Sequence, residues 1–365
     1  MDQVRPLLSY LVISYNHERF IEAALHSALC QSYSPLQIVL ADDHSDDDTL
    51  LIATRVLSGY SGPHSLTVLP ATTRVGIGRN ISRAMSACHG ELIVVAAGDD
   101  VSLPHRTARI VDAWNASGRQ ATSIYSSYMI VDESERPVGL GGTRPTAHAN
   151  ALGHEQRGSI ESFVVTRRPV VNGCTHAWSP RLFAHFGPLT ADLEDLVLSF
   201  RTHAIGSMVY IDEPLVRYRR HGANVSFLAE SDDTDGFQHR EQRLEWVNSQ
   251  TVDALDNIAA DLRELSDEHL PQASRRIVET HLASVRSQYL LELKMMRSRW
   301  PARVNYWLTA VAQGNLVAAR YSMARLLPRG LYRLLFNARE RFRAVRASHT
   351  LPARSPFESG SSLLQ

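Results

Sequence analysis

Short apolar runs alternate with amphipathic segments over the first hundred residues. Leu7–Ser14 (LLSYLVIS) is a continuous apolar run of strand length, and Glu18–Gln31 repeats apolar side chains at helical spacing. Apolar strands that alternate with helices are typical of a parallel sheet covered on both faces. The pattern therefore predicts an α/β fold, with further strands at Leu36–Ala41, Ser65–Leu69 and Glu91–Ala96 and further helices at Thr49–Ser58 and Ile77–Cys88.

The pattern is less regular beyond residue 120. Residues 139–158 are rich in Gly, Thr, Pro and His, which predicts a loop. Around this loop we expect β structure at Ala121–Val131, helices at Pro180–Phe186 and Glu194–Ala204, and a strand at Met208–Ile211.

The character of the chain changes after about Phe227. Residues 228–270 are acidic and helix-prone, whereas residues 297–346 are strongly basic with interleaved apolar side chains. We therefore expect an α/β domain at residues 1–226 and a helical region at residues 227–365.

Polar residues follow several of the predicted strands. In open α/β sheets, ligands bind beyond the carboxyl ends of the strands, and these ends meet at one edge. Asp and Asn are also common there because they cap the following helix, so a single polar tip indicates little. Together they favour a binding site formed by Tyr15-Asn16, Asp42-Asp43 and Gly98-Asp99-Asp100.

The two acidic tips predict different chemistry. A carboxylate at Asp42 or Asp43 can accept a hydrogen bond from an N–H of a nucleobase, whereas Asp46–Asp48 more simply cap a helix. Adjacent carboxylates at Asp99 and Asp100 are costly unless they are solvated, paired or bound to a cation. Mg²⁺ and Mn²⁺ prefer oxygen ligands and share them with substrate phosphates.

Two later segments carry further candidates. Glu194-Asp195 opens a predicted helix, where the macrodipole favours acidic residues and where a carboxylate can also act as a general base. Tyr218–His221 combines aromatic and basic groups that suit a phosphate or a metal, although a surface turn would have the same composition.

Composition excludes several classes of protein. The 365 residues have a formal net charge of zero, which argues against nucleic-acid binding through bulk charge. Cys30, Cys88 and Cys174 are far apart and predict neither a zinc site nor a disulfide framework. Neither a signal peptide nor a membrane-spanning run is visible. We expect a cytoplasmic protein, free or peripheral on the inner face of the membrane.

Taken in order, the motifs resemble those of the family 2 glycosyltransferases, which have the GT-A fold. The similarity extends over about the first 225 residues, through SYNHERFIEAALHSALCQSYSPLQIVLADDHSDDDT at 14–49, RVGIGRNISRAMSACHGELIVVAAGDD at 74–100 and LEDLVLSFRTHAIGSMVYIDEPLVRYRRHGANVS at 193–226. The resemblance implies a Rossmann-like, mixed but mainly parallel sheet flanked by helices, with a C-terminal helical extension. It also implies an inverting, metal-dependent enzyme of surface polysaccharide or glycan synthesis.

The resemblance assigns roles to the candidate residues. Asp195 matches the base that deprotonates the acceptor hydroxyl, and Glu194 would orient it or contact the acceptor. Trp178 resembles a platform that stacks on the acceptor sugar, with core packing as the alternative. Asp99, Asp100 and His221 would meet Mn²⁺ or Mg²⁺ and the diphosphate. The donor, for which a UDP-sugar with a hexosyl or N-acetylhexosaminyl group is favoured, would contact Ser14, Tyr15, Asn16, Asp42, Asp43, Arg74 and Asp99.

One position departs from the family pattern. The family's metal motif begins with an aspartate, and this chain has Ala97 there. The remaining Gly98-Asp99-Asp100 provides fewer carboxylates, so Asp100 is our first choice for direct metal contact.

The basic C-terminal region lies outside this resemblance. Residues 326–346 place Leu331, Leu334, Leu335 and Ala338 on one helical face with arginines around it. Basic amphipathic helices often lie on anionic membranes, which would suit a lipid-linked saccharide acceptor. The alternative is a helix that packs on the catalytic domain or on a second subunit of a homo-oligomer.

Two other functions compete with an active transferase. A nucleotide-sugar-binding homologue without activity could act as a scaffold, which Ala97 favours and the retained Asp99, Asp100 and Asp195 disfavour. A nucleotidyltransferase would need a glycine-rich, lysine-bearing phosphate loop near the first strand, and this chain has Ser14-Tyr15-Asn16 there.

Overall fold

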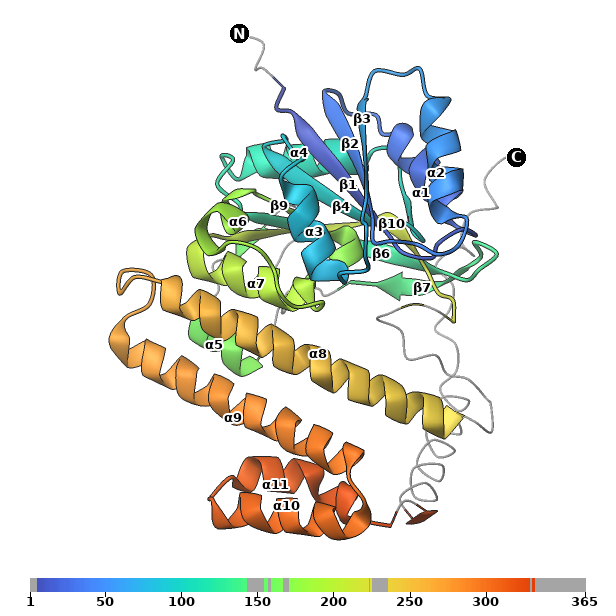
Figure 1. The fold of residues 1–365 in the computed structure, drawn as a ribbon. Coiled ribbons are helices and arrows are strands. Elements are labelled where there is room, and N and C mark those ends of the chain that lie inside the picture. Colours follow the sequence, from blue (N-terminus) through green and yellow to red (C-terminus); the bar gives the residue numbers. More distant parts are fainter. Residues whose placement is uncertain are drawn as a thin grey trace, which may run out of the picture.

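A mixed sheet flanked by helices forms the upper part of the molecule, and further helices lie on one side of it (Figure 1). The computed structural model describes residues 5–142, 154–156, 159–166, 171–222, 224, 236–328 and 330–331. The expected fold class, an α/β protein with C-terminal helices, is confirmed.

The long strands of the sheet pair in parallel, and its short strands pair antiparallel. The strand order is β3-β2-β1-β4-β9-β6-β10-β5, with β7 on β6 and β8 on β10. The bounds are β1 Leu8–Ser14, β2 Leu36–Asp42, β3 Ser65–Pro70, β4 Leu92–Ala97, β5 Val101–Ser102, β6 Ser123–Val131, β7 Pro137–Gly141, β8 His154–Gln156, β9 Ala177–Trp178 and β10 Met208–Arg219.

Alternate side chains of the central strand enter two different cores. In β1, Leu8, Tyr10 and Val12 pack with one set of helices, and Leu11 packs with the other. The first set is α1 (Ile21–Leu29), α2 (Thr49–Ser58) and α4 (Arg106–Ala116). The second set includes α3 (Ile77–Met85), α5 (Ile160–Thr166), α6 (Arg181–Phe186) and α7 (Glu194–Ile205).

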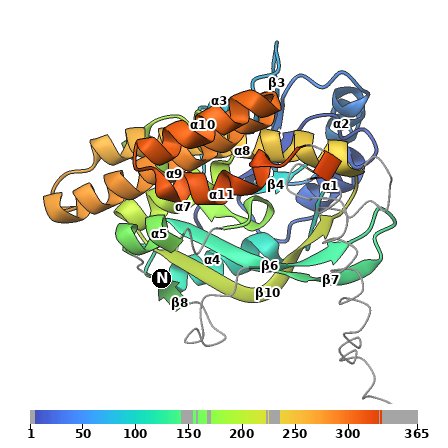
Figure 2. The same ribbon diagram turned by 90° about the horizontal axis from the view of Figure 1, so that it is seen from below.

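The second core continues into the C-terminal helices. Leu255, Ile258 and Leu262 of α8 (Gly236–Glu264) and Leu282 of α9 (Gln272–Arg297) belong to the same buried cluster as Leu11. The boundary at residue 226 stays a prediction, but the hydrophobic core runs across it. Beyond α9 lie α10 (Trp300–Ala312), α11 (Leu316–Ser322) and a short 3-10 turn, η2 (Met323–Leu326), in the layer nearest the viewer in Figure 2.

Most predicted elements are found, with shifted ends. The first helix begins at Ile21 because the backbone N–H groups of Phe20 and Ile21 both donate to the carbonyl of His17 and form a turn. The strand predicted at Met208–Ile211 continues to Arg219 because β6 pairs with it past two register shifts. Strands β5 and β9 are two residues each, too short for a periodic pattern to reveal.

Two predictions fall largely outside the described residues. Of the predicted loop at 139–158, the structure describes 139–142, of which 139–141 belong to β7, and 154–156, which form β8, so residues 139–141 and 154–156 are strands rather than loop. Of the amphipathic segment at 326–346, it describes residues 326–328 and 330–331. Among the helices that the structure describes, none has the length and hydrophobicity needed to cross a bilayer.

Candidate active site

The tips of β1 and β2 form a hydrogen-bonded unit. Ser14 and Asp42 are register partners, and the Ser14 hydroxyl donates to Asp42 Oδ1 at 2.9 Å. Ser45 donates to the same carboxylate from its hydroxyl (2.6 Å) and its backbone N–H (2.9 Å). Asp42 is 1% exposed, so its carboxylate primarily joins the two strand ends.

Next to this unit lies a more open surface. Asn16 is exposed, adopts φ 54°, and accepts a hydrogen bond on Oδ1 from the backbone N–H of Asp46 at 3.0 Å. The exposed Arg74 guanidinium lies 3.8 Å from the centre of the half-buried Tyr15 ring. A planar cation stacked on an aromatic ring at a strand tip can bind a nucleobase or a phosphate.

Asp43 holds the segment between β3 and α3. Its two carboxylate oxygens accept the backbone N–H groups of Val75 (2.8 Å) and Gly76 (2.9 Å). Gly76 has φ 90°, a conformation that favours glycine. Asp43 therefore fixes the segment that carries Arg74, and it keeps lone pairs for a ligand.

Asp99 is surrounded by nitrogen donors. His221 Nε2 lies 3.0 Å from its Oδ2, Asn224 Nδ2 donates to the same oxygen at 3.3 Å, and His17 Nε2 lies 3.6 Å away. Burial alone would raise the pKa of Asp99, but the hydrogen bond from His221 and the charges of both imidazoles hold it below its usual value. Asp99 is therefore ionised.

His17, three residues after the end of β1, is a site residue that the sequence analysis missed. A Cβ atom at Gly98 would lie 2.7 Å from His17 Nδ1, so the imidazole packs directly on the backbone before Asp99. Only glycine permits this approach. The one sequence signal was the adjacency of His17 to Tyr15-Asn16.

Asp100 lies deeper than Asp99. Its Oδ1 accepts the backbone N–H of Arg219 at 2.9 Å, and its Oδ2 is buried without a hydrogen-bond partner among the described residues. Burial and the neighbouring charge of Asp99 raise the pKa of Asp100 well above its usual value. A buried carboxylate oxygen without a partner fits a cation.

The carboxylates of Asp99 and Asp100 suit a cation that is shared with a substrate. Within the described residues, no group of three or more His, Cys, Asp or Glu side chains is arranged to hold a metal by itself. Mg²⁺ commonly uses one or two carboxylates and completes its shell with water and substrate phosphates. Asp99 and Asp100 are consistent with that pattern.

Glu194 and Asp195 occupy the first turn of α7. A Cβ atom at Gly173 would lie 2.6 Å from Glu194 Oε1, so Glu194 packs on the 3-10 turn η1 (Gly173–Thr175). The next residue of that turn, Cys174, is buried, and burial raises the pKa of its thiol. The charge of Asp100 raises this pKa further, which indicates that the two side chains lie close together. The turn η1 therefore lies between the two acidic pairs.

The pKa values of this second pair are shifted toward neutrality. Burial raises the pKa of Asp195 to about 6, and burial together with the charge of Asp195 raises the pKa of Glu194 to about 8. Asp195 Oδ1 accepts the backbone N–H of Leu196 at 2.7 Å. A carboxylate whose pKa lies near the working pH is suited to general base catalysis.

The prediction that Trp178 forms an acceptor platform is wrong. The indole is 1% exposed and belongs to the main hydrophobic cluster, with the ring of His176 at 5.2 Å and that of Phe183 at 6.2 Å between centroids. A side chain covered in this way cannot stack on a sugar. The alternative considered for Trp178, core packing, is the correct one.

Sequence comparisons relate part of the chain to a known family. Residues 9–172 match the sequence profile of glycosyl transferase family 2. An uncharacterized glycosyltransferase of a Nostoc species is 24% identical over 255 residues, which are 68% of this chain and 75% of that protein. The putative glycosyltransferase EpsE of Bacillus subtilis is 29% identical over 139 residues, 38% of this chain and 48% of that protein.

Solved structures resemble the chain more distantly. S. aureus TarS 1–349 in complex with UDP-GlcNAc is 15% identical with a TM-score of 0.45, covering 77% of this chain and 91% of that one. Mannosyltransferase PcManGT from Pyrobaculum calidifontis, in complex with GDP-Man and Mn²⁺, is 16% identical with a TM-score of 0.46, covering 88% and 87%. At these scores, the ligands of the two structures have no bearing on this chain.

The profile match spans the tips of β1, β2 and β4, and it ends before Asp195 and His221. The Nostoc relative extends the similarity over two thirds of the chain. The profile and the relatives agree that residues 9–172 are similar to glycosyl transferase family 2.

Proposed function

We propose that the chain transfers a sugar from a nucleoside-diphosphate donor to an acceptor hydroxyl in a single displacement that inverts the anomeric carbon. One observation carries the proposal. The ionised Asp99 carboxylate and the buried, unpartnered Oδ2 of Asp100 lie on one side of η1. Glu194 and Asp195, whose pKa values are near neutral, lie on the other side. Phosphate-side charge neutralisation and acceptor-side proton removal are the two requirements of such a reaction.

The donor would bind along the tips of β1 and β2. Arg74 stacked on Tyr15 provides a cationic surface for the nucleotide, and Asn16 lies exposed beside it. Asp43 retains lone pairs for a base or ribose N–H or O–H. Ser14 and Asp42, which are hydrogen-bonded to each other, would hold the strand ends that carry this surface. A UDP-sugar with a hexosyl or N-acetylhexosaminyl group remains the donor we favour.

A divalent cation, Mn²⁺ or Mg²⁺, would be held by Asp99 and Asp100 and shared with the diphosphate, with His221, the third ligand that the resemblance implies, hydrogen-bonded to Asp99 beside it. When bound, it would supply positive charge to the departing diphosphate. His221 and Asn224 orient the Asp99 carboxylate through hydrogen bonds at 3.0 and 3.3 Å. The backbone of Arg219 orients Asp100, and the Arg219 side chain donates to the Asp99 carbonyl at 3.0 Å.

Asp195 would remove the proton from the acceptor hydroxyl. With a pKa of about 6, it is mostly ionised at neutral pH, whereas Glu194, at about 8, is mostly protonated. A protonated Glu194 adds no second negative charge beside the base, and it can donate a hydrogen bond to the acceptor. This division of labour follows because the charge of Asp195 raises the pKa of Glu194 further, whereas the backbone N–H of Leu196 lowers that of Asp195.

The alternative function, a scaffold that binds nucleotide sugars without transferring them, is favoured by Ala97 alone. The shifted pKa values at Glu194 and Asp195 disfavour it, because a binding module does not need a base poised near neutrality. The acceptor, a role in surface polysaccharide synthesis, membrane association and oligomerisation all stay predictions.

A thermal-shift panel of UDP-, GDP- and dTDP-sugars, each with and without Mn²⁺, tests the donor half. We expect at least one nucleotide sugar to raise the melting temperature, and more so with Mn²⁺, because a ligand that binds only the folded state stabilises it. If no nucleotide sugar stabilises the protein, the transferase proposal fails.

A further inference from the structure

The segment that leads into α7 is fixed on its sheet side by α3. A Cβ atom at Gly78 would lie 2.0 Å from the carbonyl oxygen of Ala191, so the two backbones are in direct contact. The Gly78 N–H donates to Asp192 Oδ1 at 3.2 Å, and the Leu189 N–H donates to the Ser82 hydroxyl at 2.7 Å. We call residues 187–193, between α6 and α7, the base loop because Glu194 and Asp195 follow it.

The other side of the base loop is fixed by α8. The side-chain oxygen of Asn257 accepts both the backbone N–H of Thr190 (2.9 Å) and its hydroxyl (3.2 Å). Asn257 is 5% exposed, and its amide N–H donates to Asp261 Oδ1 at 3.2 Å. The side chain of the buried Asn257 therefore accepts hydrogen bonds from the base loop and donates one to the next turn of its own helix.

A buried ion pair continues this contact. Arg201 of α7, 0% exposed, donates to both oxygens of Asp261 at 2.7 and 3.0 Å. The same guanidinium donates to the carbonyls of Gly187 at 2.8 Å and Pro188 at 3.4 Å. The pair therefore joins α7, α8 and the start of the base loop in one hydrogen-bonded group.

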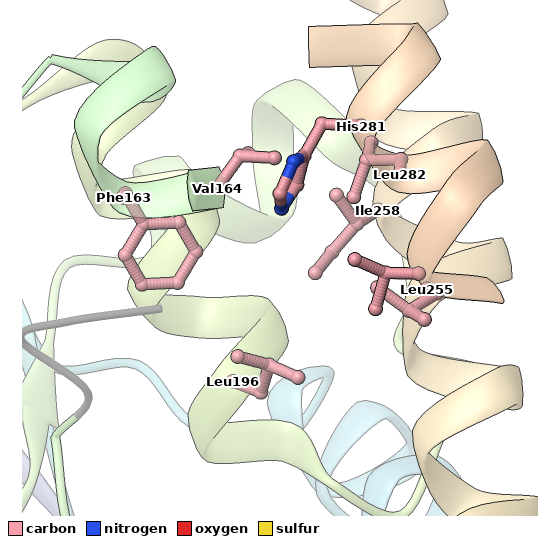
Figure 3. Close-up of a pocket in the computed structure, with 8 residues that line it drawn as sticks. Phe163, Val164, Leu196, Leu255, Ile258, His281 and Leu282 are labelled. Atoms are coloured by element: carbon pink, nitrogen blue, oxygen red, sulfur yellow. The ribbon is translucent and has the colours of Figure 1, made fainter. Parts of the chain in front are cut away.

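An apolar contact lies beside the polar one. Figure 3 shows Leu196 of α7, one residue after Asp195, facing Leu255 and Ile258 of α8 across a small apolar pocket. Ile258 directly follows Asn257 in the chain. In α8, therefore, polar and apolar side chains together locate the first turn of α7.

The first turn of α7 has no local cap that would locate it. Leu193 occupies the N-cap position and provides no side-chain hydrogen bond. Without a capping side chain, the direction in which the chain enters the helix depends on the contacts of the preceding loop. Those contacts come from α3 and α8.

We infer that α8 sets the position of the acceptor-side base, with Asn257 as the positioning residue and Asp261 with Arg201 as its support. This inference rests on the proposed function, since it assumes that Asp195 is the base. It also gives α8, which lies beyond the matched residues 9–172, a positioning role in the reaction. A base displaced by about 1 Å can cost up to about 10²-fold in rate.

Asn257→Ala tests the inference, and Asn248→Ala is its matched control. Asn248 lies on the same helix, is 6% exposed, and directs its amide to Met296 Sδ of α9 (3.7 Å), away from the base loop. Both variants remove a buried amide from α8. A general loss of stability would therefore affect both equally.

The first readout needs no turnover. Hydrogen exchange followed by NMR reports the Thr190 amide, whose acceptor is the Asn257 side chain. We expect this amide to exchange at least about tenfold faster in Asn257→Ala than in Asn248→Ala, since loss of protection follows the loss of the hydrogen bond. Equal exchange rates in the two variants would overturn the inference.

The second readout is kinetic, with a UDP-sugar as donor and nucleoside diphosphate release as the signal. We expect Asn257→Ala to bind the donor as the wild type does, to lose about 10- to 100-fold in kcat, and to move the acid limb of its pH profile to lower pH. The limb moves in that direction because water that enters a loosened base loop lowers the raised pKa of Asp195. A kcat and pH profile equal to those of Asn248→Ala would overturn the inference.

Failure of the proposed function gives a different result. If Asp195→Asn turns over like the wild type, Asp195 is not the base, and the assignment of a catalytic role to α8 falls with it. If Asp195→Asn is inactive and Asn257→Ala behaves like Asn248→Ala, only the inference about α8 falls.

Discussion

The donor edge, formed by the tips of β1, β2 and β4, and the base loop with the Glu194-Asp195 pair that follows it both carry acidic residues, but they are built from contacts of different range along the chain. At the donor edge, Ser14, Asp42 and Ser45 bond to one another across two neighbouring strands of one sheet. At the base loop, Thr190 depends on Asn257, which is 67 residues away, and Arg201 depends on Asp261, 60 residues away. The donor edge is therefore set by the α/β sheet, whereas the base depends on the C-terminal helices.

Under the proposed function, this difference assigns the two halves of the reaction to structures that can be perturbed separately. Changes in α8 should alter proton removal and leave the donor edge intact. Changes at the tips of β1, β2 and β4 should alter donor and cation binding and leave the base loop in place. Four variants sharpen or break that division.

The largest expected effect is on stability and comes from Asp261→Ala. The variant leaves the Arg201 guanidinium buried without its counter-charge, which costs about 3–5 kcal/mol in the free energy of unfolding. The control is Asp256→Ala on the same helix, whose pair with Arg286 is about half exposed, so we expect a cost of about 0–1 kcal/mol. Urea denaturation measures both. Equal costs would show that the buried pair does not join α7 to α8.

Asp100→Ala should act at the donor edge alone. We expect the variant to lose at least about tenfold in Mn²⁺-dependent donor affinity, because it removes the buried carboxylate oxygen that fits the cation. Calorimetric titration with a UDP-sugar, with and without Mn²⁺, gives the comparison. Metal-independent binding should persist, and an unchanged Mn²⁺ effect would assign the cation elsewhere.

Arg74→Ala should weaken donor binding by a smaller factor. An ionic contact of the exposed guanidinium with a donor phosphate would contribute about 0.2–1 kcal/mol, so we expect a loss of up to about fivefold in donor affinity. Arg79→Ala, which removes an exposed arginine from the first turn of α3, serves as the control. A drop of the same size in both variants would indicate bulk charge rather than a specific contact.

The last effect concerns the pH dependence of stability. Because the folded-state pKa of Glu194, about 8, lies above its ordinary value of 4.5, the folded protein holds a proton that the unfolded chain has lost between those values. The contribution of this group to stability is therefore fully present below about pH 4.5 and is lost as pH rises toward 8. Melting temperatures of Glu194→Gln should fall less steeply over this range. A slope equal to that of the wild type would show that Glu194 titrates normally.

The strand tips could be predicted because their signal is local. Apolar runs that end in Asn16, Asp42-Asp43 and Asp99-Asp100 locate the edge of a parallel sheet without any knowledge of tertiary contacts. The sequence could not show that Asp42 is saturated by two serine hydroxyls, nor that Asp100 keeps an oxygen without a partner, because both facts depend on side chains from other segments.

The acceptor side was less accessible to sequence reasoning. Trp178 lies in a polar stretch, HAWSP, and only the pairing of β9 with β4 and β6 shows that its ring is enclosed. Asn257 and Asp261 occupy a helix whose sequence is acidic and ordinary. The packing of α8 on α7 determines which residues they contact, and the pattern of a single segment carries no information about that packing.

The most direct test of the account is the rate of nucleoside diphosphate release by Asp195→Asn at saturating donor. The account predicts wild-type donor affinity with a release rate about 10²–10⁴-fold lower, because the donor edge is intact and only the general base is lost. Release at the wild-type rate would contradict the central claim that Asp195 removes the proton from the acceptor hydroxyl.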